Sequence, residues 1–232
     1  MPKRRYARKR RFRKRRRKSY RRKRTSTRYV PSGIPAKRMS RMRFCHSANL
    51  VSAGDLLVST DISANSLFNP LLTSLNNKQP LGFDQMSVLF QRYMVVGSRA
   101  RIIFNQQQAF GTPYNCWVGI HLTDADQLIP YGDHEGYIEA KKGAYTQLIS
   151  QRNQARTLAC NFSPKGWFNV KDIKDNAELG ATVTENPEKQ AKFHIWQQHI
   201  NSESTSQRNE VHYTIIIDYM VLWSEPVEIA RS

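Results

Sequence analysis

The sequence predicts an all-β protein, a single eight-stranded jelly-roll sandwich that follows a disordered basic N-terminal arm. Residues 1–43 contain 22 Lys and Arg and no Asp or Glu, and like charges at this density oppose a packed core. The rest of the chain contains about eight short segments with strand patterns and no segment with the period of a long helix. Long connections join several of these segments, which favours a Greek-key sandwich or jelly roll.

Charge divides the 232-residue chain into two regions. Of its 37 basic residues, 22 lie in the first 43 positions, which leaves 15 basic residues against all 18 acidic ones and a net charge of −3 for the remainder. We therefore expect an Arg/Lys-rich arm over residues 1–43 and one folded domain over residues 44–232. All-β sandwiches of this length often form a single domain.

The arm has the composition of a segment that binds nucleic acid. Lys and Arg neutralise phosphates without reading sequence, and aromatic side chains among them can stack on unpaired bases, which favours single strands over duplex. The alternative is that these aromatics are incidental members of a charge run. The candidate binding residues of the arm are Lys3, Arg4, Arg5, Tyr6, Arg8, Lys9, Arg10, Arg11, Phe12, Arg13, Lys14, Arg15, Arg16, Arg17, Lys18, Tyr20, Arg21, Arg22, Lys23, Arg24 and Arg28.

Two clusters within the arm, residues 3–5 and 8–18, also match a nuclear localisation signal, as any arginine-rich tail does. The N-terminus has no apolar segment of the kind found in secretory signals. No apolar run approaches the roughly 18 residues of a membrane span, so we expect no membrane insertion.

The arm leads into the first predicted strands. Two prolines and a glycine over residues 30–35 indicate a hinge, although basic residues continue to Arg43. Strands are predicted over residues 42–51 and 56–62, with Gly54-Asp55 as the turn between them. Residues 65–80 then read as a loop or short helix, and residues 85–91 as one or two helical turns.

Residues 93–104 form the clearest strand of the first half of the chain. Their two-residue period places Met94, Val96, Ala100, Ile102 and Phe104 on a face that packs in the core. The same period places Gly97, Arg99 and Arg101 on the opposite face. Arg99 and Arg101 are therefore candidate phosphate contacts, with a solvated face or an ion pair at a subunit contact as the alternative.

The middle of the chain alternates strands with long loops. Residues 115–122, 144–149, 156–162 and 192–200 are predicted strands. Residues 124–140 read as an acidic loop that is either solvated or a partner surface, and residues 164–183 as a loop with a helical turn around Asp172.

The last strand has the strongest pattern. On one face it carries Val211, Tyr213, Ile215, Ile217, Tyr219, Val221 and Trp223. Ile216, Met220 and Leu222 keep the other face largely apolar, so we expect this strand to be central and covered on both sides.

The sequence offers no recognisable catalytic or metal site, so we expect neither an enzyme nor a cofactor. Cys45, Cys116 and Cys160 are widely spaced and odd in number, which indicates buried thiols in a reducing compartment. His194 and His199 should point to opposite faces of one strand, and His121 lies near too few oxygen ligands for a hard cation. Residues 180–184 (GATVT) lack the lysine of a phosphate-binding loop.

Three stretches resemble the capsid proteins of circovirus-like viruses, which have circular single-stranded DNA genomes and encode a replication initiator protein. The first is the opening Met1-Pro2-Lys3-Arg4-Arg5-Tyr6, which continues as arginine, lysine and scattered tyrosine. The second is residues 80–104 (PLGFDQMSVLFQRYMVVGSRARIIF), where Phe90-Gln91-Arg92-Tyr93 leads into a strand with alternating basic residues. The third is the aromatic-rich strand over residues 211–223.

The resemblance implies a jelly roll that forms a sixty-copy icosahedral shell with its arms inside on single-stranded DNA. It also implies assembly in the host nucleus through a nuclear import receptor, and an attachment factor on the host cell that the sequence does not identify. RNA remains an alternative cargo because phosphate neutralisation ignores the sugar. A cellular nucleic-acid-binding protein with a basic tail and an enzyme with a nucleic-acid tether also remain open.

Overall fold

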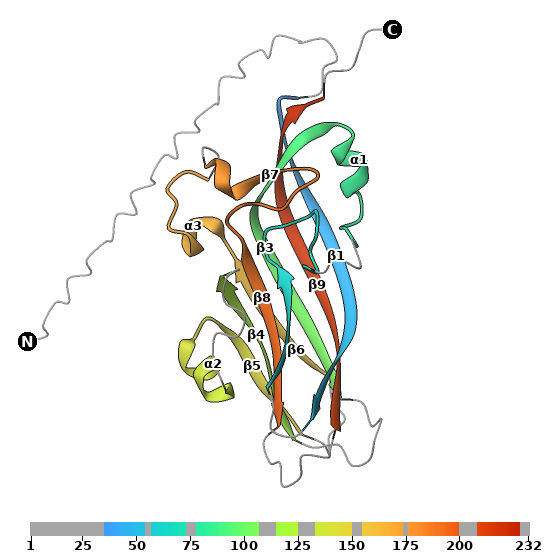
Figure 1. Ribbon diagram of the computed structural model, residues 1–232, viewed down its shortest axis with the longest axis vertical. Helices are drawn as coiled ribbons and strands as arrows, with labels where there is room; N and C mark the ends of the chain where they lie inside the picture. Colours follow the sequence, from blue (N-terminus) through green and yellow to red (C-terminus); the bar gives the residue numbers. More distant parts are fainter. Residues whose placement is uncertain are drawn as a thin grey trace, which may run out of the picture. The chain divides into compact units, whose positions relative to one another are not determined.

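The structure is a computed structural model that describes residues 35–53, 57–72, 78–106, 115–124, 133–149, 155–173, 176–199 and 208–227 (Figure 1). The chain divides into two units, Met1–Gly33 and Ile34–Ser232, and every described residue belongs to the second. The predicted arm up to residue 34 and the predicted turn at Gly54-Asp55 therefore lie outside the described residues. Among the described helices, none has the length and apolar character needed to cross a membrane.

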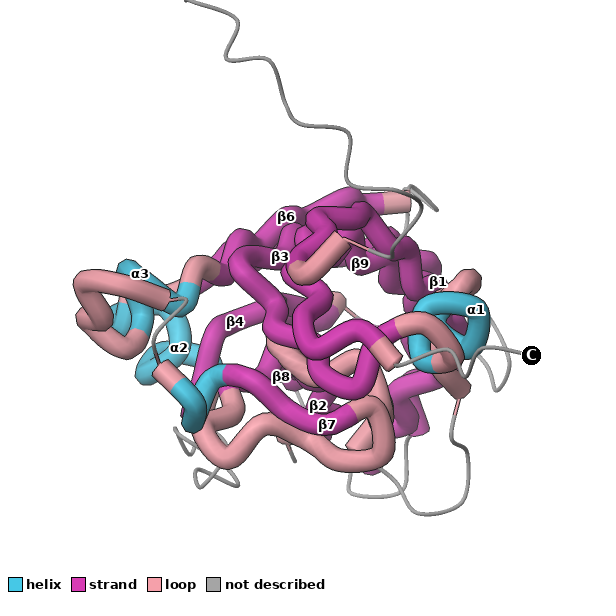
Figure 2. The backbone as a smooth tube through the Cα atoms, turned by 90° about the horizontal axis from the view of Figure 1, so that it is seen from above, coloured by secondary structure: helices cyan, strands magenta, loops and turns pink. Residues whose placement is uncertain are grey.

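Nine strands among the described residues form two antiparallel sheets, which Figure 2 shows as two layers. Sheet A has the order β1-β9-β3-β6, with the short β7 paired to β3, and sheet B has the order β2-β8-β4-β5. The strands are β1 (Lys37–Ala53), β2 (Val58–Ser63), β3 (Phe90–Gln106), β4 (Cys116–Asp124), β5 (Gly143–Leu148), β6 (Arg156–Phe162), β7 (Gly180–Thr182), β8 (Ala191–His199) and β9 (Arg208–Pro226).

This strand order is that of a jelly roll. The first and last strands, β1 and β9, are neighbours in one sheet. Apart from β7, the chain changes sheet at every connection except the one between the neighbouring strands β4 and β5. Eight strands in two sheets with Greek-key connections define the jelly roll, so the predicted all-β jelly-roll sandwich is confirmed, with β7 as a ninth strand.

Strand β1 begins at Lys37, five residues before the predicted strand and inside the region that we expected to be arm. The partner strand β9 is long enough to pair with the whole of β1, from Lys37 opposite Ser224 onward. The Trp223 indole N–H also donates to Ser40 Oγ at 2.7 Å. The sequence pattern did not reveal this strand start, because the alternation of apolar residues begins only at Met42. Ser40, the preceding residue on the inward face, is polar.

Strand β9 is central, as predicted, between β1 and β3. All seven residues predicted to face the core are buried. The expectation that its other face is also covered is confirmed at Leu222, which packs against Met94 and Leu179, and wrong at Met220, which is 42% exposed. Among the described residues, the outer face of sheet A at Met220 has no element packed over it.

Strand β3 contains a β-bulge that changes which residues face the core. Val95 pairs with Val221 and Gly97 with Met220, so Val96 is the additional residue between two pairs. An extra residue reverses the alternation of side chains on one side of the bulge. Tyr93 and Val95 therefore occupy the core positions that we predicted for Met94 and Val96, whereas Ala100, Ile102 and Phe104 are buried as predicted.

Short helices occupy segments that we expected to be loops. Residues 134–140 form a helix because the Asp133 side chain caps it, accepting the Gly136 N–H at 2.9 Å. Residues 164–183 contain two short helices and β7 instead of a turn around Asp172. The predicted helical turns at residues 85–91 lie slightly earlier, and Phe90 already begins β3. The helices are α1 (Phe83–Ser87), α2 (His134–Ala140), α3 (Pro164–Trp167) and the 3-10 helix η2 (Ala177–Leu179).

The core lies between the two sheets, and buried hydroxyl groups tie sheet A to the segment after β2. Tyr219 donates to the Ser63 carbonyl at 2.8 Å, and Ser98 donates to the Ala64 carbonyl at 2.6 Å. Complete burial raises the pKa of Tyr219, so its hydroxyl stays protonated as a donor. Since buried polar groups must be paired, these bonds help to hold the register between the sheets.

Candidate nucleic-acid interface

The predicted nucleic-acid-binding residues from Lys3 to Arg28 lie outside the described residues. Arg99 and Arg101 are described, and both are exposed on the outer face of β3. Their neighbours Ala100 and Ile102 are fully buried, so the prediction that the two arginines face away from the core is confirmed. They lie on the same face of sheet A as the uncovered centre of β9.

Strand pairing brings two further arginines to this face. Arg43 on β1 and Arg99 on β3 are both aligned with Asp218 on β9, and Arg41 lies two residues before Arg43. Neighbouring strands are about 4.8 Å apart, so these side chains share a small area of surface. We call Arg41, Arg43, Arg99 and Arg101 the arginine cluster.

One carboxylate lies within the arginine cluster. Arg43 Nε donates to Asp218 Oδ1 at 2.6 Å, and Arg101 Nη2 lies 3.6 Å from Asp218 Oδ2. The hydrogen bond with Asp218 raises the pKa of Arg43. Within the described part of the chain, neither Arg41 nor Arg99 forms an ion pair, so four guanidinium groups share one carboxylate.

The outer face of sheet A is hollowed at the arginine cluster. The hollow has a volume of about 830 Å³, and Val96 and Gly97 of the bulge in β3 are among the residues that line it. Gly97 has no side chain to fill the space, and a Cβ there would meet only the Phe162 carbonyl oxygen, at 3.5 Å. The cationic and apolar side chains that line the hollow include Arg41, Arg43, Arg99, Val96 and Met220.

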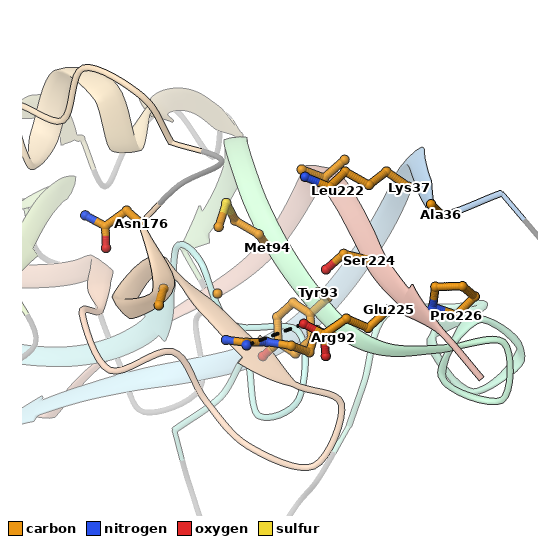
Figure 3. Close-up of a pocket in the computed structure, with 12 residues that line it drawn as sticks. Ala36, Lys37, Arg92, Tyr93, Met94, Asn176, Leu222, Ser224, Glu225 and Pro226 are labelled. Atoms are coloured by element: carbon orange, nitrogen blue, oxygen red, sulfur yellow. Dashed lines mark ion pairs between the residues drawn. The ribbon is translucent and has the colours of Figure 1, made fainter. Parts of the chain in front are cut away.

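A second hollow, of about 480 Å³, lies beside the first, nearer the end of sheet A where β1 begins and β9 ends (Figure 3). Arg92 points toward Glu225 there, and their charged groups are 3.6 Å apart. Lys37 and Met94 also line this hollow. Because its arginine is matched by a carboxylate, it presents less positive charge than the arginine cluster.

Helix α2 packs on the outer face of sheet B through aromatic contacts. Tyr137 of α2 is fully buried and stacks on Trp196 of β8, with ring centroids 4.9 Å apart and an angle of 18° between the planes. Gly119 on the neighbouring strand leaves room for the indole, because a Cβ there would lie 2.5 Å from a Trp196 ring atom. This face therefore resembles a second small core.

Two histidines lie beneath α2 in a chain of hydrogen bonds. The His194 Nδ1–H donates to Asp61 Oδ1 at 2.6 Å, and the Tyr137 hydroxyl donates to His194 Nε2 at 2.7 Å. The Trp196 indole N–H donates to His121 Nδ1 at 2.9 Å, so the proton of His121 is on Nε2, which lies 2.8 Å from the Tyr137 carbonyl. Burial lowers the pKa of His121 to about 4.

The order Asp61–His194–Tyr137 has the hydrogen bonds of a catalytic triad, but the geometry does not support that role. A nucleophile must reach a substrate, and the Tyr137 side chain is fully buried. His194 and His199 face opposite sides of β8, as predicted. Across the described ranges, no three His, Cys, Asp or Glu side chains come close enough to hold a metal ion.

The three cysteines differ from the prediction in one case. Cys116 and Cys160 are buried, as expected, and burial raises the pKa of Cys160 to about 11. Cys45 is exposed on the outer face of β1, two residues from Arg43. The expectation of a buried thiol is therefore wrong at Cys45.

Arg41, Arg43 and Asp218 were not among the predicted site residues. Arg41 and Arg43 belong to the basic region, where the charge run hid the start of β1. The alternation of Arg41, Met42, Arg43 and Phe44 was the signal that could have identified them as surface residues of a strand. Asp218 is an isolated acid in an apolar strand, and the sequence has no local indication of its partners.

Comparisons with known proteins give similarities in structure only. No protein-family model and no curated protein sequence matches the chain. A structure of desmodium yellow mottle tymovirus has a TM-score of 0.43 and 13% identity, over 87% of this chain and 95% of that chain. A structure of mud crab tombus-like virus has a TM-score of 0.45 and 13% identity, over 86% of this chain and 95% of that chain.

A third similar structure is that of a semi-empty virus-like particle of the nodavirus of the giant freshwater prawn Macrobrachium rosenbergii. Its TM-score is 0.44 with 13% identity, over 87% of this chain and 100% of that chain. Because all three TM-scores lie below 0.5, we base the fold assignment on the strand order alone, which is that of a jelly roll.

Proposed function

We propose that this protein is a structural capsid protein, not an enzyme, that assembles into a small icosahedral shell and packages a single-stranded nucleic acid. The observation that carries the proposal is the division of charge along the chain. Of the 22 basic residues among the first 43, 18 precede β1 of the jelly roll and four lie within it, while residues 44–232 have a net charge of −3. A domain with so little net charge can pack against its own copies without strong repulsion.

The basic segment supplies charge on the scale of a small genome. In a shell of sixty copies, the 22 basic residues of each chain bring roughly 1,300 positive charges, enough for a strand of the order of one to two thousand nucleotides. Arg99 and Arg101 add phosphate contacts on the folded domain. We propose single-stranded DNA as the cargo, on the resemblance to circovirus-like capsid proteins, with RNA as the alternative.

The proposal places the protein in the virion and, during assembly, in the host nucleus. Residues 3–5 and 8–18 would bind a nuclear import receptor. The partner of each chain within the shell is another copy of itself, and the attachment factor on the host cell is not specified.

Electron microscopy of the full-length protein expressed alone tests the proposal. We expect uniform closed particles whose absorbance at 260 nm relative to 280 nm indicates bound nucleic acid. Separate digestion of the particle contents with DNase and RNase then identifies the cargo. A monomer that binds nucleic acid and forms no closed particles at any salt concentration would contradict the proposal and favour a cellular nucleic-acid-binding protein.

A further inference from the structure

We propose that the arginine cluster is a binding site for the phosphodiester backbone of the packaged strand, and that the outer face of sheet A therefore faces the nucleic acid. This inference rests on the proposed function and adds a defined site on the folded domain. The residues that form the site are Arg41, Arg43, Arg99 and Arg101, with Asp218 as their internal counter-ion.

The cluster has cationic groups available for an anion. Arg41 and Arg99 form no ion pair with another described residue, and Arg43 uses its Nε–H for Asp218. A guanidinium has five N–H donors, so Arg43 retains its terminal donors for a second acceptor. Arginine is the side chain that matches phosphate oxygens with two parallel hydrogen bonds. A phosphodiester between Arg41, Arg43 and Arg99 would supply the missing acceptors.

The hollow has the size and lining that a nucleotide requires. Its volume of about 830 Å³ lies within the range of roughly 300–1,000 Å³ that is typical of small-molecule sites. Val96 and Met220 line the hollow beside the arginines, and Met220 is 42% exposed. Their apolar surface can contact a sugar or base while the arginines bind the phosphate. The lining thus combines cationic and apolar side chains.

Asp218 offsets part of the positive charge of this site. Its two oxygens contact Arg43 and Arg101 from two different strands, and one carboxylate does not neutralise four arginines. Along the sequence, the basic segment leads directly into β1, the strand that carries Arg41 and Arg43. Arg28 and Lys37 are nine positions apart, which is at most about 32 Å of extended chain.

Protection from an arginine-specific dicarbonyl reagent tests the inference, with the modified residues located by peptide mass spectrometry. The full-length chain is kept unassembled, as checked by sedimentation, and is treated with and without oligothymidylate. At an oligonucleotide concentration about ten times the dissociation constant, mass action predicts about tenfold slower modification of Arg41 and Arg99. The arginines of the N-terminal segment report on the proposed function in the same sample.

Two variants at Gly97 provide matched controls. Gly97→Glu places a carboxylate in the hollow, and Gly97→Ala does not fill it. Both should fold, because a Cβ at this position meets only the Phe162 carbonyl oxygen at an ordinary contact distance of 3.5 Å. We expect oligothymidylate to protect Arg41 and Arg99 in the Gly97→Ala variant and to lose this effect in the Gly97→Glu variant, with equal protection of the N-terminal arginines in both.

The outcomes separate the two proposals. Protected N-terminal arginines with unprotected Arg41 and Arg99 would overturn the site and leave the proposed function standing. No protection anywhere would overturn both. Protection of Arg41 and Arg99 by heparin, but not by oligothymidylate, would overturn the site as a nucleic-acid contact and identify a sulfated polysaccharide as its ligand.

Discussion

The outer faces of the two sheets differ in cover, chemistry and charge. On sheet B, α2 covers the strands, and Tyr137, Trp196 and His194 are buried beneath it with their polar atoms hydrogen-bonded. On sheet A, the face at Met220 is uncovered, and four arginines surround one carboxylate. The same alternation of inward and outward residues thus produces a second small core on one side and an open cationic surface on the other.

This difference indicates how the work of the domain is divided. A buried face whose polar groups are already hydrogen-bonded within the chain contributes to stability. An exposed face with unpaired cations can instead bind a partner. Substitutions on sheet B should therefore change the free energy of unfolding. Matched substitutions on sheet A should leave it nearly unchanged and should alter binding.

The largest effect is expected from removing the ring of Tyr137. Tyr137→Ala opens a cavity against Trp196 and removes the partner of His194, so we expect the free energy of unfolding to fall by about 3–5 kcal/mol. Met220→Ala on sheet A removes a half-exposed side chain and should stay within about 0.5 kcal/mol of the unmodified protein. Urea denaturation of both variants measures the difference, and equal losses would contradict the contrast between the faces.

Acid should destabilise the protein through His121. Its pKa is about 4 in the folded protein, below the ordinary value of 6.5. The unfolded chain therefore binds the extra proton first, and stability is lost as the pH falls from about 6.5 toward 4. At about 1.4 kcal/mol for each of these 2.5 pKa units, the loss is at most about 3.5 kcal/mol.

The His121→Asn variant isolates this contribution. The asparagine side-chain oxygen can still accept the Trp196 indole N–H, but the side chain does not titrate. We compare the free energy of unfolding at pH 7 and pH 4.5 for the variant and the unmodified protein, since other titrating groups are common to both. The pH dependence should be shallower in the variant, and identical pH dependences would show that His121 does not carry the acid effect.

Substitutions at two glycines should differ in their effect on the free energy of unfolding by an intermediate amount. At Gly119 on sheet B a Cβ would lie 2.5 Å from the Trp196 ring, so Gly119→Ala should lower the free energy of unfolding, by about 1–3 kcal/mol. At Gly97 on sheet A the nearest atom is 3.5 Å away. Gly97→Ala should therefore be neutral, or stabilising by less than about 1 kcal/mol. Thermal unfolding of both variants tests this, and a larger loss for Gly97→Ala would reverse the comparison.

The smallest effect on stability is expected at Asp218, where binding should change instead. Asp218→Asn removes an exposed carboxylate, and exposed ion pairs contribute little to stability. We expect an unchanged denaturation midpoint and tighter binding of oligothymidylate, measured by fluorescence anisotropy. Glu139→Gln on α2 is the control, because it changes the net charge equally at an exposed site away from the cluster. Equal effects of the two variants on binding would show that only total charge matters.

The sequence by itself determined the class of fold and the division of charge. The seven apolar and aromatic residues that alternate along β9 identified its core face, and the position of β9 in the sheet followed from its apolar pattern. The outward direction of Arg99 and Arg101 followed from the same two-residue period. These features depend on neighbours within one strand, so local pattern is sufficient to predict them.

The tertiary structure decided where strands begin, where they bulge and what covers them. β1 starts at Lys37 because it pairs there with Ser224 of β9, which lies 187 positions later in the sequence. The bulge at Val96 exchanges the core residues of β3, and α2 buries the histidines of sheet B through Tyr137. The arginine cluster exists because Arg43 and Asp218, 175 residues apart, are paired across neighbouring strands. Pairing between distant segments is a property of the folded chain, and no local periodicity encodes it.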